Sequence, residues 1–183
     1  IKQLTPMGPD CFAEKLKSQQ ANRLIDDFTG KQQWKTITDT VMGGNSTAEL
    51  AYTDGSINVK TKIGKTGAFG AWTGIEMNYP TPVNASEFEG LTITYRGSSI
   101  PFGLSVYHQD VKDYDHFRAQ LPQSKDWSTY KVSFSDLKQW GYGRSIDWSA
   151  EAITGLSLSW GLLPGQQSPN TSNTIEIREI SYF

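Results

Sequence analysis

With 183 residues, of which 37% are hydrophobic and 20% charged, the chain is long enough to bury the core of one domain and too apolar to be disordered. The net charge of −2, with no two adjacent Lys or Arg residues, argues against a nucleic-acid-binding protein, which needs clustered positive charge. One Cys and two His residues exclude an internal disulfide and a Cys- or His-rich zinc site. No apolar run reaches the roughly 18 residues of a membrane span.

The first 22 residues differ in pattern from the rest of the chain. Pro9–Lys17 follow the breakers Pro6 and Gly8 and suit a short helix, so we predict a partly helical N-terminal extension over residues 1–22. Residues 23–183 are predicted to form a β-sandwich domain, because short alternating segments there are separated by turn residues.

The predicted strands indicate an all-β fold. In chain order they are Leu24–Phe28, Trp34–Ile37, Ala48–Tyr52, Ser56–Ile63, Ala68–Met77, Gly90–Tyr95, Phe102–His108, His116–Leu121, Thr129–Phe134, Leu156–Trp160 and Thr174–Tyr182. The pair Asp54-Gly55 predicts a hairpin, and Phe134–Gln139 suggests one helical turn. Many short strands with turns between them indicate an antiparallel sandwich, with a jelly roll favoured.

Alternation within these strands separates a core face from a face of small polar groups. Leu156, Leu158 and Trp160 alternate with serines, and the apolar residues of the neighbouring strands alternate with Tyr107, His116 and Arg118. Short hydrogen-bonding groups beside flat rings suit a sugar-binding face, since the C–H face of a sugar stacks on aromatic rings. A plain solvent-exposed antiparallel face is the alternative interpretation.

Further rings lie in loops or beside them. Trp72, Tyr114, Trp140 and Tyr142 are the candidates, and the last two alternate with glycines that favour exposed rings.

The pair Gly43-Gly44 predicts a tight loop between strands, packed against the sandwich through Val41 or Met42. A rim loop beside a binding face is the more specific interpretation of the same pair.

Signals for catalysis are few. Asp110, Asp113 and Asp115 form an alternating acidic run near both histidines, which could supply a glycosidase pair or oxygen ligands for a cation. A solvated loop is the alternative interpretation of this run. A Ser–His–Asp arrangement using His108 or His116 also stays open.

The segment Ile37–Ser46 resembles the D-x-V-M-G-G-x-S signature of the complex I intermediate-associated protein family. Phe117–Ala119, Trp127–Val132 and Phe134–Leu137 resemble later segments of the same family in order, so the likeness runs from about Leu24 to the end of the chain. The resemblance implies a galactose-binding-like jelly roll and, as one function, an assembly or scaffold protein.

The segment Ile25–Gly30 is similar to the start of family 11 carbohydrate-binding modules, which share that fold and bind β-glucan chains on a concave face. Carried over by strand order, this resemblance implies ligand binding by Tyr107, Asp115, His116, Arg118, the loop Trp140–Tyr142 and Trp160. It also implies a structural calcium with Asp27 as a ligand, although Arg178-Glu179 stand where an Asp would be expected in the closing strand.

Three functions follow from these patterns. The first is a non-catalytic carbohydrate-binding module for a polysaccharide of the β-glucan type, extracellular or secreted, with a covalently linked catalytic domain as a partner. The second is an assembly or scaffold protein of the complex I intermediate-associated type. The third is a carbohydrate-active enzyme.

Overall fold

The computed structural model describes residues 23–30, 34–167 and 171–183, which form an antiparallel β-sandwich. The prediction of an all-β fold is confirmed. The strands of the sandwich are β1 (Leu24–Asp26), β2 (Lys35–Thr38), β3 (Thr47–Thr53), β4 (Ser56–Lys62), β5 (Ala71–Val83), β6 (Gly90–Arg96), β7 (Phe102–His108), β8 (Phe117–Leu121), β9 (Ser128–Ser133), β10 (Ile153–Leu162) and β11 (Ser172–Tyr182). The predicted extension over 1–22 lies outside the described residues, so its helix and its boundary stay predictions.

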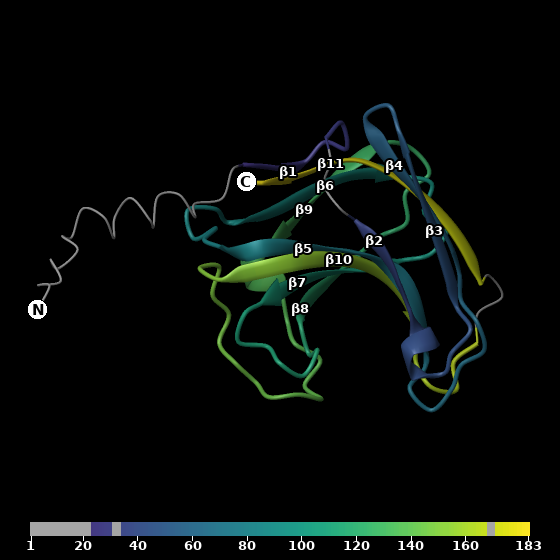
Figure 1. The fold of residues 1–183 in the computed structure, drawn as a ribbon. Coiled ribbons are helices and arrows are strands. Elements are labelled where there is room, and N and C mark those ends of the chain that lie inside the picture. The colour runs from purple at the N-terminus through teal and green to yellow at the C-terminus, as the bar shows by residue number, and fades with distance from the viewer. Residues whose placement is uncertain (1–22, 31–33, 168–170) are drawn as a thin grey trace, which may run out of the picture.

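Two sheets face each other across the core (Figure 1). One has the order β3-β4-β11-β6-β9, with β1 paired to β11, and the other has the order β2-β5-β10-β7-β8. Most neighbours are distant in sequence, whereas the predicted hairpin at Asp54-Gly55 joins β3 to β4 directly, with Gly55 at φ +71°. In Figure 1 the right-hand ends of β2, β5 and β10 bend downward.

Aromatic side chains link the two sheets inside the sandwich. The Phe102 ring of β7 lies 4.9 Å from the ring of Tyr95 on β6 and 5.3 Å from that of Trp160 on β10. All three side chains are at most 1% exposed. Burial of such large apolar side chains is the main source of stability in a sandwich of this kind.

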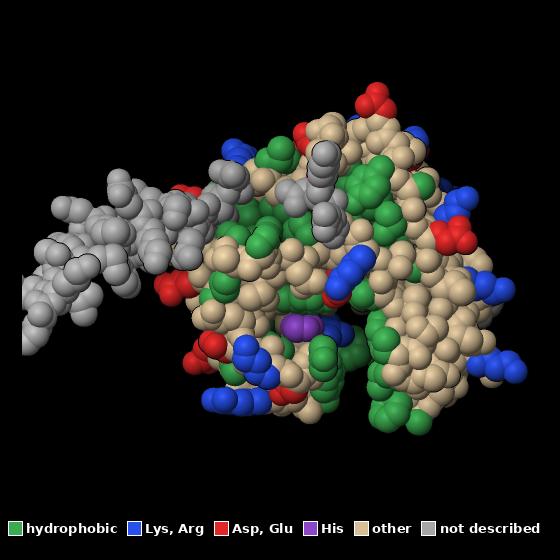
Figure 2. Space-filling model, in the orientation of Figure 1, with side chains coloured by type: hydrophobic (Ala, Val, Ile, Leu, Met, Phe, Trp, Pro, Cys, Tyr) green, Lys and Arg blue, Asp and Glu red, His purple; other side chains and the backbone are tan. Residues whose placement is uncertain are grey.

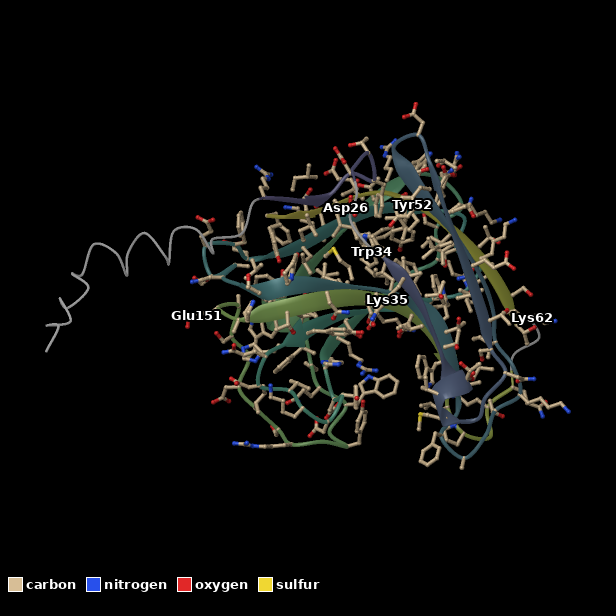
Figure 3. The ribbon with its side chains drawn as sticks, in the orientation of Figure 1. Asp26, Trp34, Lys35, Tyr52, Lys62 and Glu151 are labelled. Carbon is tan, nitrogen blue, oxygen red and sulfur yellow. The ribbon has the colours of Figure 1, made fainter. Side chains whose placement is uncertain are left out.

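Another contact fixes the edge strand β2 against the opposite sheet. The Trp34 indole N–H donates to Asp26 Oδ2 at 2.8 Å, and the backbone N–H of Trp34 donates to the Tyr52 hydroxyl at 3.3 Å. Figure 3 shows these three side chains together where β1, β2 and β3 meet. The next residue, Lys35, starts β2 and therefore has a fixed place at the sheet edge.

Two details differ from the predictions. The strand predicted over Ala68–Met77 starts only at Ala71 and continues to Val83, because Gly67 and Gly70 first close a tight turn through reciprocal hydrogen bonds of 3.1 Å. The helical turn predicted over Phe134–Gln139 is a 3-10 turn confined to Phe134–Asp136. Neither this turn nor the other described helix, η1 (Asp39–Met42), is long enough to cross a membrane.

Candidate functional site

The outer face of the β2-β5-β10-β7-β8 sheet carries a polar row that crosses all five strands. Lys35 pairs with Glu76, Glu76 with Ser157, Ser157 with Ser105, and Ser105 with Arg118. Because paired residues point to the same side of a sheet, these five side chains lie side by side over a length of about 19 Å. This row forms the floor of the candidate site.

Small residues flank the polar row on both sides along the strands. The next row along the strands contains Gly74, Ser159 and Gly103, and the row on the other side places Gly155 beside Tyr107. Gly74, Gly155, Ser105 and Ser157 are nevertheless buried, and Gly103 and Ser159 are half-buried. A ligand would therefore meet chiefly the longer side chains of Lys35, Glu76, Tyr107 and Arg118.

Charged and aromatic groups are connected along the floor. The Glu76 carboxylate pairs with Lys35 Nζ at 2.9 Å and accepts a hydrogen bond of 2.9 Å from the Tyr107 hydroxyl. The Tyr107 ring stacks on the His116 ring, with 4.0 Å between centroids. Burial, followed by the neighbouring Arg118, lowers the pKa of His116 to about 4, so this imidazole is neutral at pH 7.

Three exposed rings form one wall at the end of the strands where β7 finishes and β10 begins. Tyr114, Trp140 and Tyr142 are 61 to 77% exposed, and the Tyr142 hydroxyl donates to the Tyr114 carbonyl oxygen at 2.6 Å. The Arg118 guanidinium lies 4.1 Å from the Trp140 ring centroid, a cation–π contact that joins wall to floor.

Two acidic residues hold this wall in place from below. The fully buried Asp115 carboxylate accepts backbone hydrogen bonds from Trp140 at 2.9 Å, Gly141 at 2.9 Å and Gly143 at 3.1 Å. Asp113 accepts a further one, of 2.6 Å, from the N–H of Arg144. Asp115 therefore supports the wall and does not itself reach the surface.

The second wall lies at the opposite ends of the strands and contains the Gly43-Gly44 pair. Gly43 takes φ +81° at the end of η1, so the predicted tight loop is found. The expected anchor is wrong, because Val41 is 82% and Met42 50% exposed. Asp39, 3% exposed, anchors the loop instead.

Hydrogen bonds of the Asp39 carboxylate explain the spacing of this motif. It accepts from the Ser46 N–H at 2.9 Å, the Ser46 hydroxyl at 2.7 Å and the Trp72 N–H at 3.2 Å. A Cβ at Gly44 would lie 2.2 Å from Asp39 Cγ, so glycine is required there. The motif thus ties the loop to the start of β5, where Trp72 and the 71% exposed Phe69 complete the second wall.

A hollow separates the two walls in the space-filling view (Figure 2). Hydrophobic surface flanks it on both sides, and histidine and basic surface is visible at its inner end. We call this hollow the groove: its floor is the polar row with Tyr107 and His116, and its walls are the two ring-bearing ends.

Most of the residues that the sequence singled out meet at the groove. Six of them lie on its floor or first wall and one on its second wall: Tyr107, His116, Arg118, Tyr114, Trp140, Tyr142 and Trp72. The expectation that Trp160 contributes to the binding face is wrong, because its side chain is 1% exposed and packs in the core, as alternation alone indicates.

Asp27, the candidate calcium ligand, lies on the other sheet's side, after β1. Its Oδ1 already accepts hydrogen bonds from the Thr29 N–H at 3.0 Å and the Thr29 hydroxyl at 2.6 Å. Across the described ranges, no three His, Cys, Asp or Glu side chains gather as a metal site would require. The carboxylates present there do not make a calcium cage around Asp27, and calcium binding stays a prediction.

The sequence alone predicts no binding role for Glu76, Lys35, Met42 or Phe69. Alternation does predict the face on which Glu76 lies, since Trp72, Gly74 and Glu76 alternate with core residues in a predicted strand. The positions of Lys35, Met42 and Phe69 at the groove depend on tertiary contacts, so the sequence pattern does not predict them.

The two-sheet sandwich fold of this chain is similar to that of solved carbohydrate-binding modules. A family 11 carbohydrate-binding module from Clostridium thermocellum, solved with a β-1,3-1,4-mixed-linked tetrasaccharide, has a similar fold, with a TM-score of 0.64 at 13% identity over 88% of this chain and 94% of that one. The module of the cellulosomal cellulase Lic26A-Cel5E of the same organism gives a TM-score of 0.62 at 15% identity, over 90% and 95%.

By sequence, the chain belongs to the family described as complex I intermediate-associated protein 30 (CIA30), whose model matches residues 25–168. Endoglucanase 3 of Fibrobacter succinogenes is 37% identical over 70 residues, which is 38% of this chain and only 10% of that relative. Both resemblances expected from the sequence are therefore confirmed.

Proposed function

We propose that this protein is a non-catalytic carbohydrate-binding module that holds a segment of a β-glucan-type polysaccharide across its groove. The observation that carries the proposal is the polar row of five residues lying between two walls of exposed rings. Rings can stack on the C–H faces of sugars, while the Arg118 guanidinium and the Glu76 carboxylate can bond to hydroxyls.

The direction of the row supports a chain-like ligand. It runs across the strands for about 19 Å, which suits several sugar units better than a single one. The mixed-linked glucan of the family 11 module and the endoglucanase match both favour β-glucan as the first glycan to test.

The acidic run does not favour catalysis. A glycosidase needs two carboxyl groups free to act on the bond between two sugars. Here the Asp115 carboxylate is buried under three backbone N–H groups, and Asp113 accepts two backbone hydrogen bonds. Both are engaged in holding the wall.

The match covers only 10% of the endoglucanase, so that relative contains much more than the matching segment. We therefore extend the proposal to the domains that would accompany this module. A covalently linked catalytic domain would be the partner, and a polysaccharide substrate of this kind would place the protein outside the cell. The family description suggests an alternative function, an assembly role. If that function is correct, the folded protein should bind no glycan.

Isothermal titration calorimetry with soluble mixed-linked β-glucan, xylan and mannan tests the proposal. We expect heat with the β-glucan, and weaker binding after Trp140→Ala. Absence of heat with every glycan, from protein with a normal melting transition, would overturn the proposal in favour of the assembly role.

A further inference from the structure

A separate pocket opens within the second wall of the groove. Its volume is about 390 Å³, at the lower end of the range for small-molecule sites. The loop from Asp39 to Asn45 forms one side, and Lys65–Gly70 with Trp72 form the other. The pocket thus lies where the V-M-G-G-x-S motif meets the start of β5.

The lining of the pocket combines rings with unused donors. Phe69 and Trp72 supply aromatic faces. Within the described ranges, no hydrogen bond or ion pair engages the Asn45 amide nitrogen, the Lys65 ammonium or the Thr66 hydroxyl, although Asn45 Oδ1 accepts from the Lys65 N–H at 3.1 Å. Rings beside neutral and positively charged donors are the groups that recognise a sugar.

The pocket is formed before any ligand arrives. On one side, Asp39 fixes the motif through its bonds to Ser46 and Trp72. On the other, Gly67 and Gly70 exchange two backbone hydrogen bonds of 3.1 Å. A preformed site loses little conformational entropy on binding, which favours affinity.

Trp72 connects this pocket to the groove. It lines the pocket and also pairs with Gly161 on β10, so it stands on the same sheet face as the polar row. Trp72 lies four residues from Glu76 along β5, about 13 Å from the polar row, so a branch or a chain end that turns along β5 would extend from that row to the pocket.

We propose that the pocket binds one pyranose residue of the chain held in the groove, either its terminal unit or a branch. This inference rests on the proposed function and assigns a specificity role to the motif that marks the family. It predicts that affinity depends on whether the ligand carries a unit that enters the pocket.

Two variants and a control test this inference by calorimetry. Thr66→Trp fills the pocket, and Phe69→Ala removes a ring from its lining. Thr174→Trp makes the same substitution as the first variant at an exposed position of β11, in the other sheet and away from both walls, and Thr174 does not line the pocket. The probes are linear β-glucan oligosaccharides of increasing length and a branched xyloglucan oligosaccharide.

For wild type and Thr174→Trp we expect an increase in affinity once the ligand carries the unit that enters the pocket. Both pocket variants should lose that increase, by about tenfold, and should bind shorter ligands as wild type does. The linear and branched series show whether the unit is terminal or a branch.

Equal affinities of wild type and both pocket variants for every ligand would overturn the inference and leave the groove function intact. So would an equal loss at every length. Failure of the wild type to bind any of the oligosaccharides or soluble β-glucan would instead overturn the proposed function. If Thr66→Trp does not fold, Phe69→Ala carries the same comparison.

Discussion

The buried carboxylate of Asp115 accepts a hydrogen bond of 2.9 Å from the backbone N–H of Trp140, 25 residues further along the chain. Its second oxygen accepts from Gly141 and Gly143, so one side chain fixes the whole turn that presents the Trp140 ring. The Trp140 ring in turn covers the Arg118 guanidinium on the groove floor. The position of the first wall therefore depends on a residue that no ligand can touch.

Replacement of this carboxylate should loosen the wall. Asp115→Ala leaves three backbone N–H groups without their acceptor, and we expect the free energy of unfolding to fall by about 2–3 kcal/mol. Chemical denaturation measures this change. Asp110→Ala, on the same loop but with a 65% exposed side chain, is the control and should unfold like wild type. Equal stability of the two variants would show that Asp115 does not support the loop.

Removal of the exposed wall ring should affect binding without affecting the fold. Trp140→Ala should weaken binding of soluble β-glucan by about 2 kcal/mol or more, because stacked aromatic rings dominate interfaces of this kind. Trp127→Ala is the matched control, since Trp127 leads into β9 of the other sheet and packs between the guanidinium groups of Arg96 and Arg178. Similar losses of affinity for the two variants would contradict a site in the groove.

The glycine pair of the motif should tolerate substitution unequally. Gly44→Ala places a Cβ 2.2 Å from Asp39 Cγ and would break the hydrogen bonds of that buried carboxylate, so we expect a loss of about 2–3 kcal/mol. Gly43→Ala meets no atom within 4 Å and suffers only from its φ of +81°, a cost of about 1 kcal/mol. Melting temperatures that rank the two variants in the opposite order would contradict this explanation.

Stability should depend on pH through His116. Its pKa is about 4 in the folded protein, below the ordinary value of 6.5, so the unfolded chain binds a proton more readily. The stabilising effect of the neutral imidazole is complete above pH 6.5 and is lost as the pH falls from 6.5 to 4.

The melting temperatures of wild type and His116→Gln between pH 4 and 7.5 measure this effect. Burial also lowers the pKa of His108, so both proteins should lose stability in acid. The wild type should lose more, since only it carries both histidines. Parallel curves for the two proteins would refute a perturbed pKa at His116.

Local pattern was sufficient to predict the strands and much of the groove floor. Tyr107 and Arg118 were placed opposite the core because side chains alternate along a strand regardless of what surrounds it. The same rule predicts that Trp160 faces the core, as observed, whereas its assignment to the binding face depends only on the resemblance by strand order. Alternation is the more reliable guide because it depends only on the local geometry of the strand.

The roles of the acidic residues could not be predicted in this way. Asp115 was expected to face a ligand, yet its partners at Trp140 to Gly143 come from a different loop. Asp39 has no predicted role of its own within the motif, yet its carboxylate accepts hydrogen bonds from both Ser46 and Trp72. In both cases the hydrogen-bond partners are fixed by the packing of distant segments.

An all-β sandwich, the two faces of its strands and a loop that turns near Gly43 can all be predicted from the sequence alone. Each of these follows from backbone sterics and from side chains close together in the chain. The alignment of Lys35, Glu76 and Arg118 in one row depends on strand pairing, which brings together residues more than 80 positions apart. The sequence does not reveal this row, because register is set by the fit of whole strands across the core and no single segment encodes it.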